Sequence, residues 1–201
     1  MVSCFPVANM TGSFMHFWKK SKWLAQGLLC LFLWQAGGAV ADGIEVKSAE
    51  LVATGDAYQL NADFGIDVSN EVEEALSKGV PLNFLIEFQL VSPRKYWFDD
   101  EITTASQRIR LSYHALSRQY LINLPQHQKS FATLAEALDE LSHIRDWIVL
   151  EKTQIAKGEN YQAMLRLRLD HSRLPKALQV EALGSEKWNL VSERYRWTPV
   201  F

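Results

Sequence analysis

The chain has 201 residues, of which 48% are hydrophobic and 22% charged, and its formal net charge is −2. This size and composition suit one globular domain with a real hydrophobic core, and the balance is too acidic for a general nucleic-acid-binding protein. Both cysteines, Cys4 and Cys30, lie near the N-terminus. Residues 42–201 therefore offer no disulfide, thiol nucleophile or cysteine metal site.

Residues 1–41 have the pattern of a cleaved signal peptide. Three lysines precede an apolar run of 12 residues at 23–34, which is shorter than the roughly 20 residues that a membrane-spanning helix needs. The lysines of this positive segment are Lys19, Lys20 and Lys22. The leader predicts export rather than permanent anchoring.

The end of the leader supplies a cleavage pattern. The small residues Ala39 and Ala41 predict a signal cleavage site before Asp42, which leaves a mature chain with 18 basic and 23 acidic residues. Leu29 directly before Cys30 does not suit lipid attachment at that cysteine. We expect a periplasmic protein with no stable membrane insertion after signal cleavage.

The mature chain opens with a predicted β-hairpin. Residues 44–53 form one strand candidate, residues 58–64 alternate apolar and polar side chains, and Gly55 lies in the turn between them. Asp67–Lys78 then changes to helical spacing, with Ser69 as the expected N-cap.

The most apolar strand is predicted at Leu82–Val91, with its alternate apolar side chains at the centre of the core. Pro93 follows it. A second hairpin is then expected, in which Lys95–Phe98 pairs with the residues from Ile102 onward around the acidic turn at 99–101.

Gln107–Leu124 predicts a further hairpin with its turn at Leu116-Ser117. The apolar residues that this hairpin is expected to bury are Ile109, Leu111, Tyr113, Tyr120 and Ile122.

Ser130 is the expected cap of a second amphipathic helix, at residues 131–144.

The last third of the chain is predicted to be strands, joined by turns and a proline step. The expected strands are Trp147–Lys152, Tyr161–Asp170, a short one at Leu178–Leu183 and a final one at Trp188–Trp197. No repeat or linker divides residues 42–201. The predicted fold is therefore α+β and mainly β: a single antiparallel β-sandwich-like domain with two short amphipathic helices.

No local motif for catalysis or for a cofactor is present in residues 42–201. The histidines are scattered, no serine lies in a Gly-x-Ser-x-Gly elbow, and the acidic turn lacks the spacing of a calcium loop. We therefore assign no catalytic residue, cofactor or metal ligand. A periplasmic hydrolase that assembles dispersed Asp, Glu and His residues is the alternative.

Arginines form the sharper candidate site. Arg108 and Arg110 share one strand face, and Arg166 and Arg168 share another. If these strands are neighbours, the four guanidinium groups would form a patch for a carboxylate, a phosphate or a protein partner. The simpler interpretation is a solvated sheet face where the arginines pair with acidic residues. The candidate acidic partners are Glu87, Glu151 and Asp170.

Aromatic residues allow two further interpretations. The mature tryptophans are expected in the core or at its rim, with an exposed aromatic binding patch as the alternative. They are Trp97, Trp147, Trp188 and Trp197. The alternating Tyr195, Trp197 and Phe201 are similar to the terminal signal of small outer-membrane β-barrels. Pro199 and the charged side chains on the strands weigh against such a barrel.

The combination of five sequence features resembles one protein family. They are the leader, LSYHALSRQY, SFATLAEALDEL, the strand ending in MLRLRLD with the Leu174-Pro175 step after it, and the tryptophan-bounded end. The chain resembles a family of exported proteobacterial proteins catalogued as a domain of unknown function. That resemblance carries no catalytic residues. It implies a gene that often lies beside a sensor kinase of the nitrogen-regulation type, and hence an accessory role in envelope signalling.

Overall fold

The computed structural model describes residues 43–156 and 158–201. The expected signal peptide and its cleavage site at Ala39 and Ala41 lie outside these residues. The strands are β1 (Gly43–Thr54), β2 (Ala57–Asp67), β3 (Leu82–Ser92), β4 (Asp100–His114), β5 (Gln119–Asn123), β6 (Gln128–Phe131), β7 (His143–Glu151), β8 (Gln162–Leu169) and β9 (Tyr195–Trp197). The α-helices are α2 (Asn70–Ser77), α3 (Leu134–Ser142) and α4 (Lys176–Gly184), and the 3-10 turns are η1 (Lys152–Gln154), η2 (His171–Arg173) and η3 (Glu186–Trp188).

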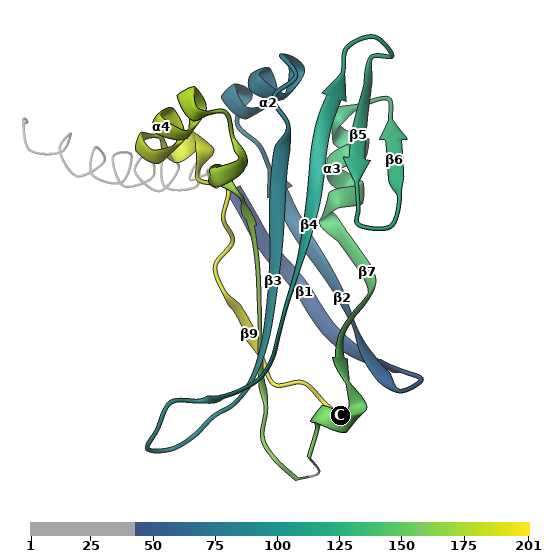
Figure 1. Cartoon of the computed structure of the whole chain (residues 1–201), viewed down its shortest axis with the longest axis vertical. Coiled ribbons are helices and arrows are strands. Elements are labelled where there is room, and N and C mark those ends of the chain that lie inside the picture. The colour runs from purple at the N-terminus through teal and green to yellow at the C-terminus, as the bar shows by residue number, and fades with distance from the viewer. Residues whose placement is uncertain (1–42, 157) are drawn as a thin grey trace, which may run out of the picture. The chain divides into compact units, whose positions relative to one another are not determined.

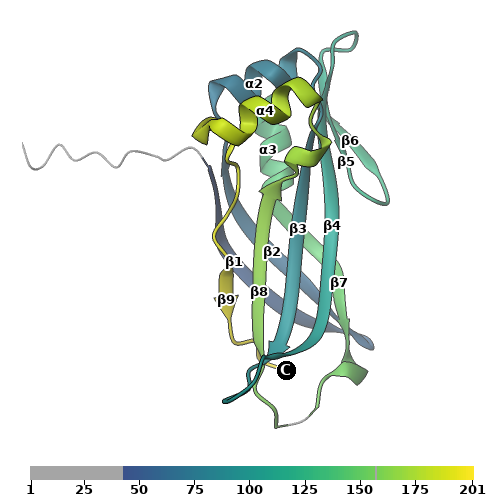
Figure 2. The same cartoon turned by 60° about the vertical axis from the view of Figure 1, so that its left-hand side comes forward.

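Two antiparallel sheets organise the described residues (Figure 1). One has the strand order β1-β2-β7, and the other has the order β6-β5-β4-β3-β8-β9. Helices α2 and α4 lie together at one end of the strands in both views (Figure 2). The predicted α+β, mainly β, sandwich-like fold is confirmed, with three α-helices in the described part of the chain rather than two.

Strand β3 lies at the centre of the larger sheet, between β4 and β8. Its inward side chains are at most 1% exposed, as the sequence predicted for Leu82, Phe84, Ile86, Phe88 and Leu90. The inward side chains of β8 are equally enclosed, at 2% exposure or less; they are Ala163, Leu165, Leu167 and Leu169. Each large apolar side chain buried in this way contributes about 1.5–3 kcal/mol of transfer free energy.

Residues 43–78 follow their predicted pattern of a β-hairpin and a helix. Gly55 turns the β1–β2 hairpin at a φ of 56°, a left-handed conformation that glycine adopts without a Cβ clash. At the start of α2, the Ser69 hydroxyl accepts a hydrogen bond from the Val72 amide at 3.4 Å. Burial of Val72 and Leu76 fixes the helix against the sheets.

The hairpin expected at 107–124 is also present, as the paired ends of β4 and β5. Ile109, Leu111 and Ile122 are at most 1% exposed. Tyr113 and Tyr120 face each other across the two strands, with their ring centroids 4.9 Å apart, and remain half-buried.

The predicted strand at Lys95–Phe98 is wrong. β3 pairs directly with β4, and residues 93–99 form the loop that joins them. Pro93 has no amide hydrogen to donate to a sheet. The Arg94 amide donates to Asp99 Oδ1 at 3.2 Å, which closes the loop on itself instead of extending the ladder. The expected acidic turn therefore contributes one loop residue and the start of β4.

The second helix begins later than predicted, because Ser130 belongs to strand β6. The N-cap is Thr133, whose hydroxyl accepts from the Glu136 amide at 3.2 Å. The Glu136 carboxylate in turn accepts from the Thr133 amide at 3.3 Å, which completes a capping box. The helix ends before His143, where β7 starts.

Two predictions near the C-terminus are also wrong. Residues 178–183 lie in helix α4 and form no strand. The expected strand at 188–197 is reduced to β9, while its first half runs irregularly beside β8. There the Ser192 amide donates to the Leu167 carbonyl at 2.8 Å, and the Ser192 hydroxyl accepts from the Leu167 amide at 3.0 Å.

Candidate functional site

The four candidate arginines all lie on the outer face of the six-stranded sheet, but on strands that are not neighbours. β4 carries Arg108 and Arg110, β8 carries Arg166 and Arg168, and β3 runs between them. Leu85 of β3 stands opposite Arg108 on one side and Arg168 on the other. Two strand spacings of about 4.8 Å therefore separate the two arginine pairs.

Glu87 on β3 holds the two arginines of β8. Its Oε2 accepts from Arg166 Nε at 2.9 Å and from Arg166 Nη2 at 2.5 Å. Arg168 makes longer contacts of 3.3 and 3.4 Å to the same carboxylate. Burial acts to raise the pKa of Glu87, but the hydrogen bonds and charges of Arg166 and Arg168 outweigh it and lower that pKa below its ordinary value. Glu87 is therefore a fixed counter-charge.

Asp170, directly after β8, is the second carboxylate at this face. It is buried, and its Oδ1 accepts from the Ser172 hydroxyl at 2.6 Å. These bonds from Ser172 lower the pKa of Asp170, and the nearby Arg168 and Arg108 lower it further. Arg108 Nε lies 4.0 Å from Asp170 Oδ2, at the outer limit of an ion pair.

Arg110 differs from the other three arginines. Its side chain is exposed, and its register neighbours are Asn83 on β3 and Asn123 on β5. Within the described residues it makes no ion pair with a carboxylate. Glu87 and Asp170 thus provide the acidic partners expected for arginines on a solvated sheet face. Arg110 and the exposed Arg108 still have guanidinium donors available to bind an anion.

An open hollow of about 390 Å³ lies on the same face, beside the Glu87–Arg166 pair. Gln89, Glu101 and Thr104 line it from β3 and β4. Glu101 accepts hydrogen bonds from Gln89 at 3.0 Å and from Thr104 at 2.9 Å. Arg194 also lines the hollow and adds a further cation. The hollow is lined by both acidic and basic side chains, which suits a polar surface contact rather than the enclosure of a small apolar ligand.

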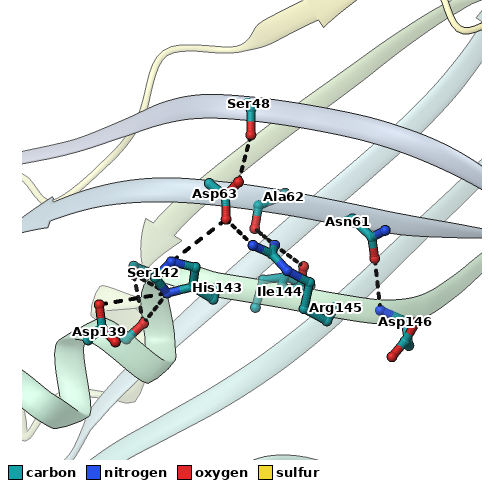
Figure 3. Close-up of polar contacts among 10 residues, drawn as sticks. All are labelled: Ser48, Asn61, Ala62, Asp63, Asp139, Ser142, His143, Ile144, Arg145 and Asp146. Atoms are coloured by element: carbon teal, nitrogen blue, oxygen red, sulfur yellow. Dashed lines mark hydrogen bonds and ion pairs between the residues drawn. The ribbon is translucent and has the colours of Figure 1, made fainter.

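A second polar cluster joins β2, β7 and the end of α3 (Figure 3). Asp63 on β2 forms an ion pair with Arg145 and accepts from the Ser48 hydroxyl at 2.8 Å. These two bonds, Arg145 first, lower the pKa of Asp63. Arg145 also donates to the Ala62 carbonyl at 2.9 Å, so its guanidinium ties β7 to β2.

This cluster brings a serine, a histidine and an aspartate together without forming a catalytic triad. His143 Nδ1 lies 2.7 Å from the Asp139 carbonyl, which can only accept, so Nδ1 carries the proton. The Ser142 hydroxyl donates to the same carbonyl at 2.7 Å, and Nδ1 cannot serve as its base. His143 Nε2 is 3.8 Å from Asp63, too far for a hydrogen bond. The contacts of this cluster therefore terminate α3 and hold β7 against β2.

Two other histidines of the described residues make local contacts. His114 Nδ1 lies 2.9 Å from the Ser117 hydroxyl in the β4–β5 turn. His171 Nε2 lies 2.7 Å from the Trp188 carbonyl. Among the described residues, no three histidine, cysteine, aspartate or glutamate side chains are grouped so that they could hold a metal ion.

Trp97 is the tryptophan that the core-or-rim expectation misplaced. Trp188 is 2% exposed, and Trp147 and Trp197 are partly buried. Trp97 is 80% exposed, between Tyr96 at 85% and Phe98 at 94%. The signal in the sequence was three successive aromatic residues with no alternating polar partner, directly after a proline, an arginine and a lysine.

The described residues thus form a two-sheet antiparallel α+β domain with a polar, arginine-bearing sheet face. None of their helices combines the length and apolar character that a membrane-crossing helix requires. The family model described as "Domain of unknown function (DUF4390)" matches residues 41–198, and the chain belongs to this family. No curated protein and no solved structure matched the chain.

Proposed function

We propose that the protein is an exported, non-catalytic binding module whose arginine-bearing sheet face receives an acidic segment of a partner protein. One observation carries the proposal: Arg108 and Arg110 project from β4 with at most one 4.0 Å carboxylate contact between them. Elsewhere on this face, Glu87 is shared by Arg166 and Arg168, which leaves the face with a cationic excess. Export is supported by the lysine-rich leader and its Ala39–Ala41 cleavage pattern.

Two properties of the face favour a protein segment over a small enclosed ligand. The hollow beside Glu87 is open, and both polar and apolar side chains line it. The cations lie in rows along β4 and β8, so that an extended acidic chain could meet several of them in turn. A membrane sensor kinase is the partner that the family resemblance suggests, and it would make the module an accessory of envelope signalling.

The test is recovery of a partner from the periplasmic and membrane fractions of the native bacterium with the tagged full chain. Arg108→Ala with Arg110→Ala removes the two least paired cations, and a second variant adds Arg166→Ala and Arg168→Ala. Arg173→Ala with Lys176→Ala is the matched control, because it removes the same charge from exposed positions in η2 and α4.

We expect the double variant to lose about 1–3 kcal/mol of binding free energy for two charge-assisted contacts, and recovery to fall with added salt. The control should bind as the native chain does. If all three variants recover the same partner, these arginines do not contribute to its binding. Loss of binding in the control as well would show that overall charge, rather than this face, attracts the partner.

A further inference from the structure

The β3–β4 loop presents three large aromatic side chains to solvent in succession. Tyr96, Trp97 and Phe98 are 85%, 80% and 94% exposed. Exposed aromatic groups of about 150–250 Å² each are costly to keep in water without a partner. In both overall views the loop protrudes from the end of the strands opposite α2 and α4 (Figures 1 and 2).

The loop is braced at its base. The Arg94 amide donates to Asp99 Oδ1 at 3.2 Å, and the Arg94 guanidinium forms an ion pair with Asp100. These contacts join the two ends of the loop and leave Lys95–Phe98 at its tip. Bracing lowers the ordering cost when the tip meets a partner.

Chemistry distinguishes the kind of partner. Tyrosine and tryptophan have a polar atom on an apolar ring, which is the combination that concentrates at the boundary between lipid headgroups and acyl chains. Lys95 Nζ lies 5.8 Å from the centroid of the Tyr96 ring, so a cation that suits lipid phosphate stands directly beside the aromatic tip. The charge of Arg94 is already offset by Asp100.

We propose that the β3–β4 loop, residues 93–99, inserts its aromatic tip reversibly into the headgroup region of a phospholipid bilayer. This contact uses a different surface from the arginine-bearing sheet face and does not depend on the function proposed above. One available cation makes anionic lipid helpful but not essential. Insertion would hold the domain at a membrane without any spanning segment among its described residues.

The experiment follows Trp97 itself, because the apolar residues 23–34 could bring the full chain to vesicles by another route. Phosphatidylcholine vesicles with brominated acyl chains quench only tryptophans that enter the bilayer. The Trp97 signal is the difference between the full chain and its Trp97→Phe variant. We expect brominated lipid to quench this signal, and phosphatidylglycerol to strengthen the effect modestly.

Tyr96→Ser with Phe98→Ser keeps the reporter and should weaken insertion about tenfold or more, since burial of one such ring exceeds the free energy of a tenfold change. Val180→Ser with Leu183→Ser is the matched control, because these α4 side chains are 75% and 83% exposed. The control should leave Trp97 quenching unchanged. Unquenched Trp97 in the native chain, or equal quenching after the Tyr96 and Phe98 changes, would overturn the proposal.

Discussion

Replacing Glu87 by glutamine tests how strongly the sheet face depends on its shared counter-charge. Glutamine keeps the shape of the side chain but leaves Arg166 and Arg168 without the carboxylate that they contact at 2.5–3.4 Å. Hydrogen bonds to a charged group contribute about 1.5–3 kcal/mol, and fully exposed ion pairs about 0–1 kcal/mol. The three side chains are 29–33% exposed, between these limits. We expect a loss of about 1–2 kcal/mol in unfolding free energy.

The measurement is urea unfolding of the native chain and the Glu87→Gln variant between neutral and acid pH. Glu101→Gln is the control: it makes the same chemical change on β4, at a carboxylate that contacts Gln89 and Thr104. It should cost less, because no arginine loses a charge partner. A Glu87→Gln loss no larger than the control's would refute the assignment of Glu87 as the counter-charge.

The pH dependence has a defined sign. The folded-state pKa of Glu87 lies below its unfolded value, because Arg166 and Arg168 outweigh the effect of burial. The stability that Glu87 supplies is therefore complete above its ordinary pKa of 4.5 and is lost as the pH falls through the lower folded value. The gap between native chain and variant should stay constant from neutral pH down to about 5 and then close. A gap that widens in acid would contradict this reasoning.

Three further predictions concern the fold and are read from the same unfolding curves. Phe88→Ala should cost about 3–5 kcal/mol, since Phe88 is fully buried on the central strand; a loss below 1 kcal/mol would mean that the core there is loose. Thr133→Ala should cost about 1 kcal/mol through the capping box, whereas Ser130→Ala should change little; a reversed order would restore Ser130 as the cap. Asp146 has a φ of 56°, so Asp146→Val should destabilise by about 1–2 kcal/mol while Asp146→Gly stays near neutral, and equal effects would refute backbone strain there.

Where the sequence predicted the fold well, one face of an element was completely enclosed. The inward side chains of β3 and β8 enter the core, while most of the outward ones, with the exception of buried Leu85 and Val91 on β3, are polar or partly exposed. The errors fall where burial does not dominate. Residues 178–183 read as a strand because Val180 and Leu183, two large apolar side chains of α4, are exposed and disturb the helical period.

Local hydrogen bonds explain the other errors. A serine with an apolar run after it suggested Ser130 as the cap, but Thr133 has the reciprocal partner Glu136 three residues later. The aromatic residues 96–98 favour a strand by propensity, yet no neighbouring strand pairs with them. Pairing across a sheet is a long-range property that local pattern does not encode.

The arginine site shows the same limit. Alternation placed Arg108 with Arg110, and Arg166 with Arg168, on common faces. Only the strand order shows that β3 lies between the two pairs and that Glu87 on β3 reaches the β8 arginines. The exposed tip at Trp97 depends likewise on how β3 connects to β4.

The central position of β3 has a consequence for the order of assembly. One edge of β3 pairs with β4, the next strand of the chain, but the other edge waits for β8, which follows β4, β5, β6 and β7. A chain that emerges with its N-terminus first therefore carries an apolar strand with one unpaired edge until most of the domain has emerged. Such late closure slows folding and invites association between incomplete chains. A holding chaperone would be most useful to this protein before Gln162–Leu169 arrives.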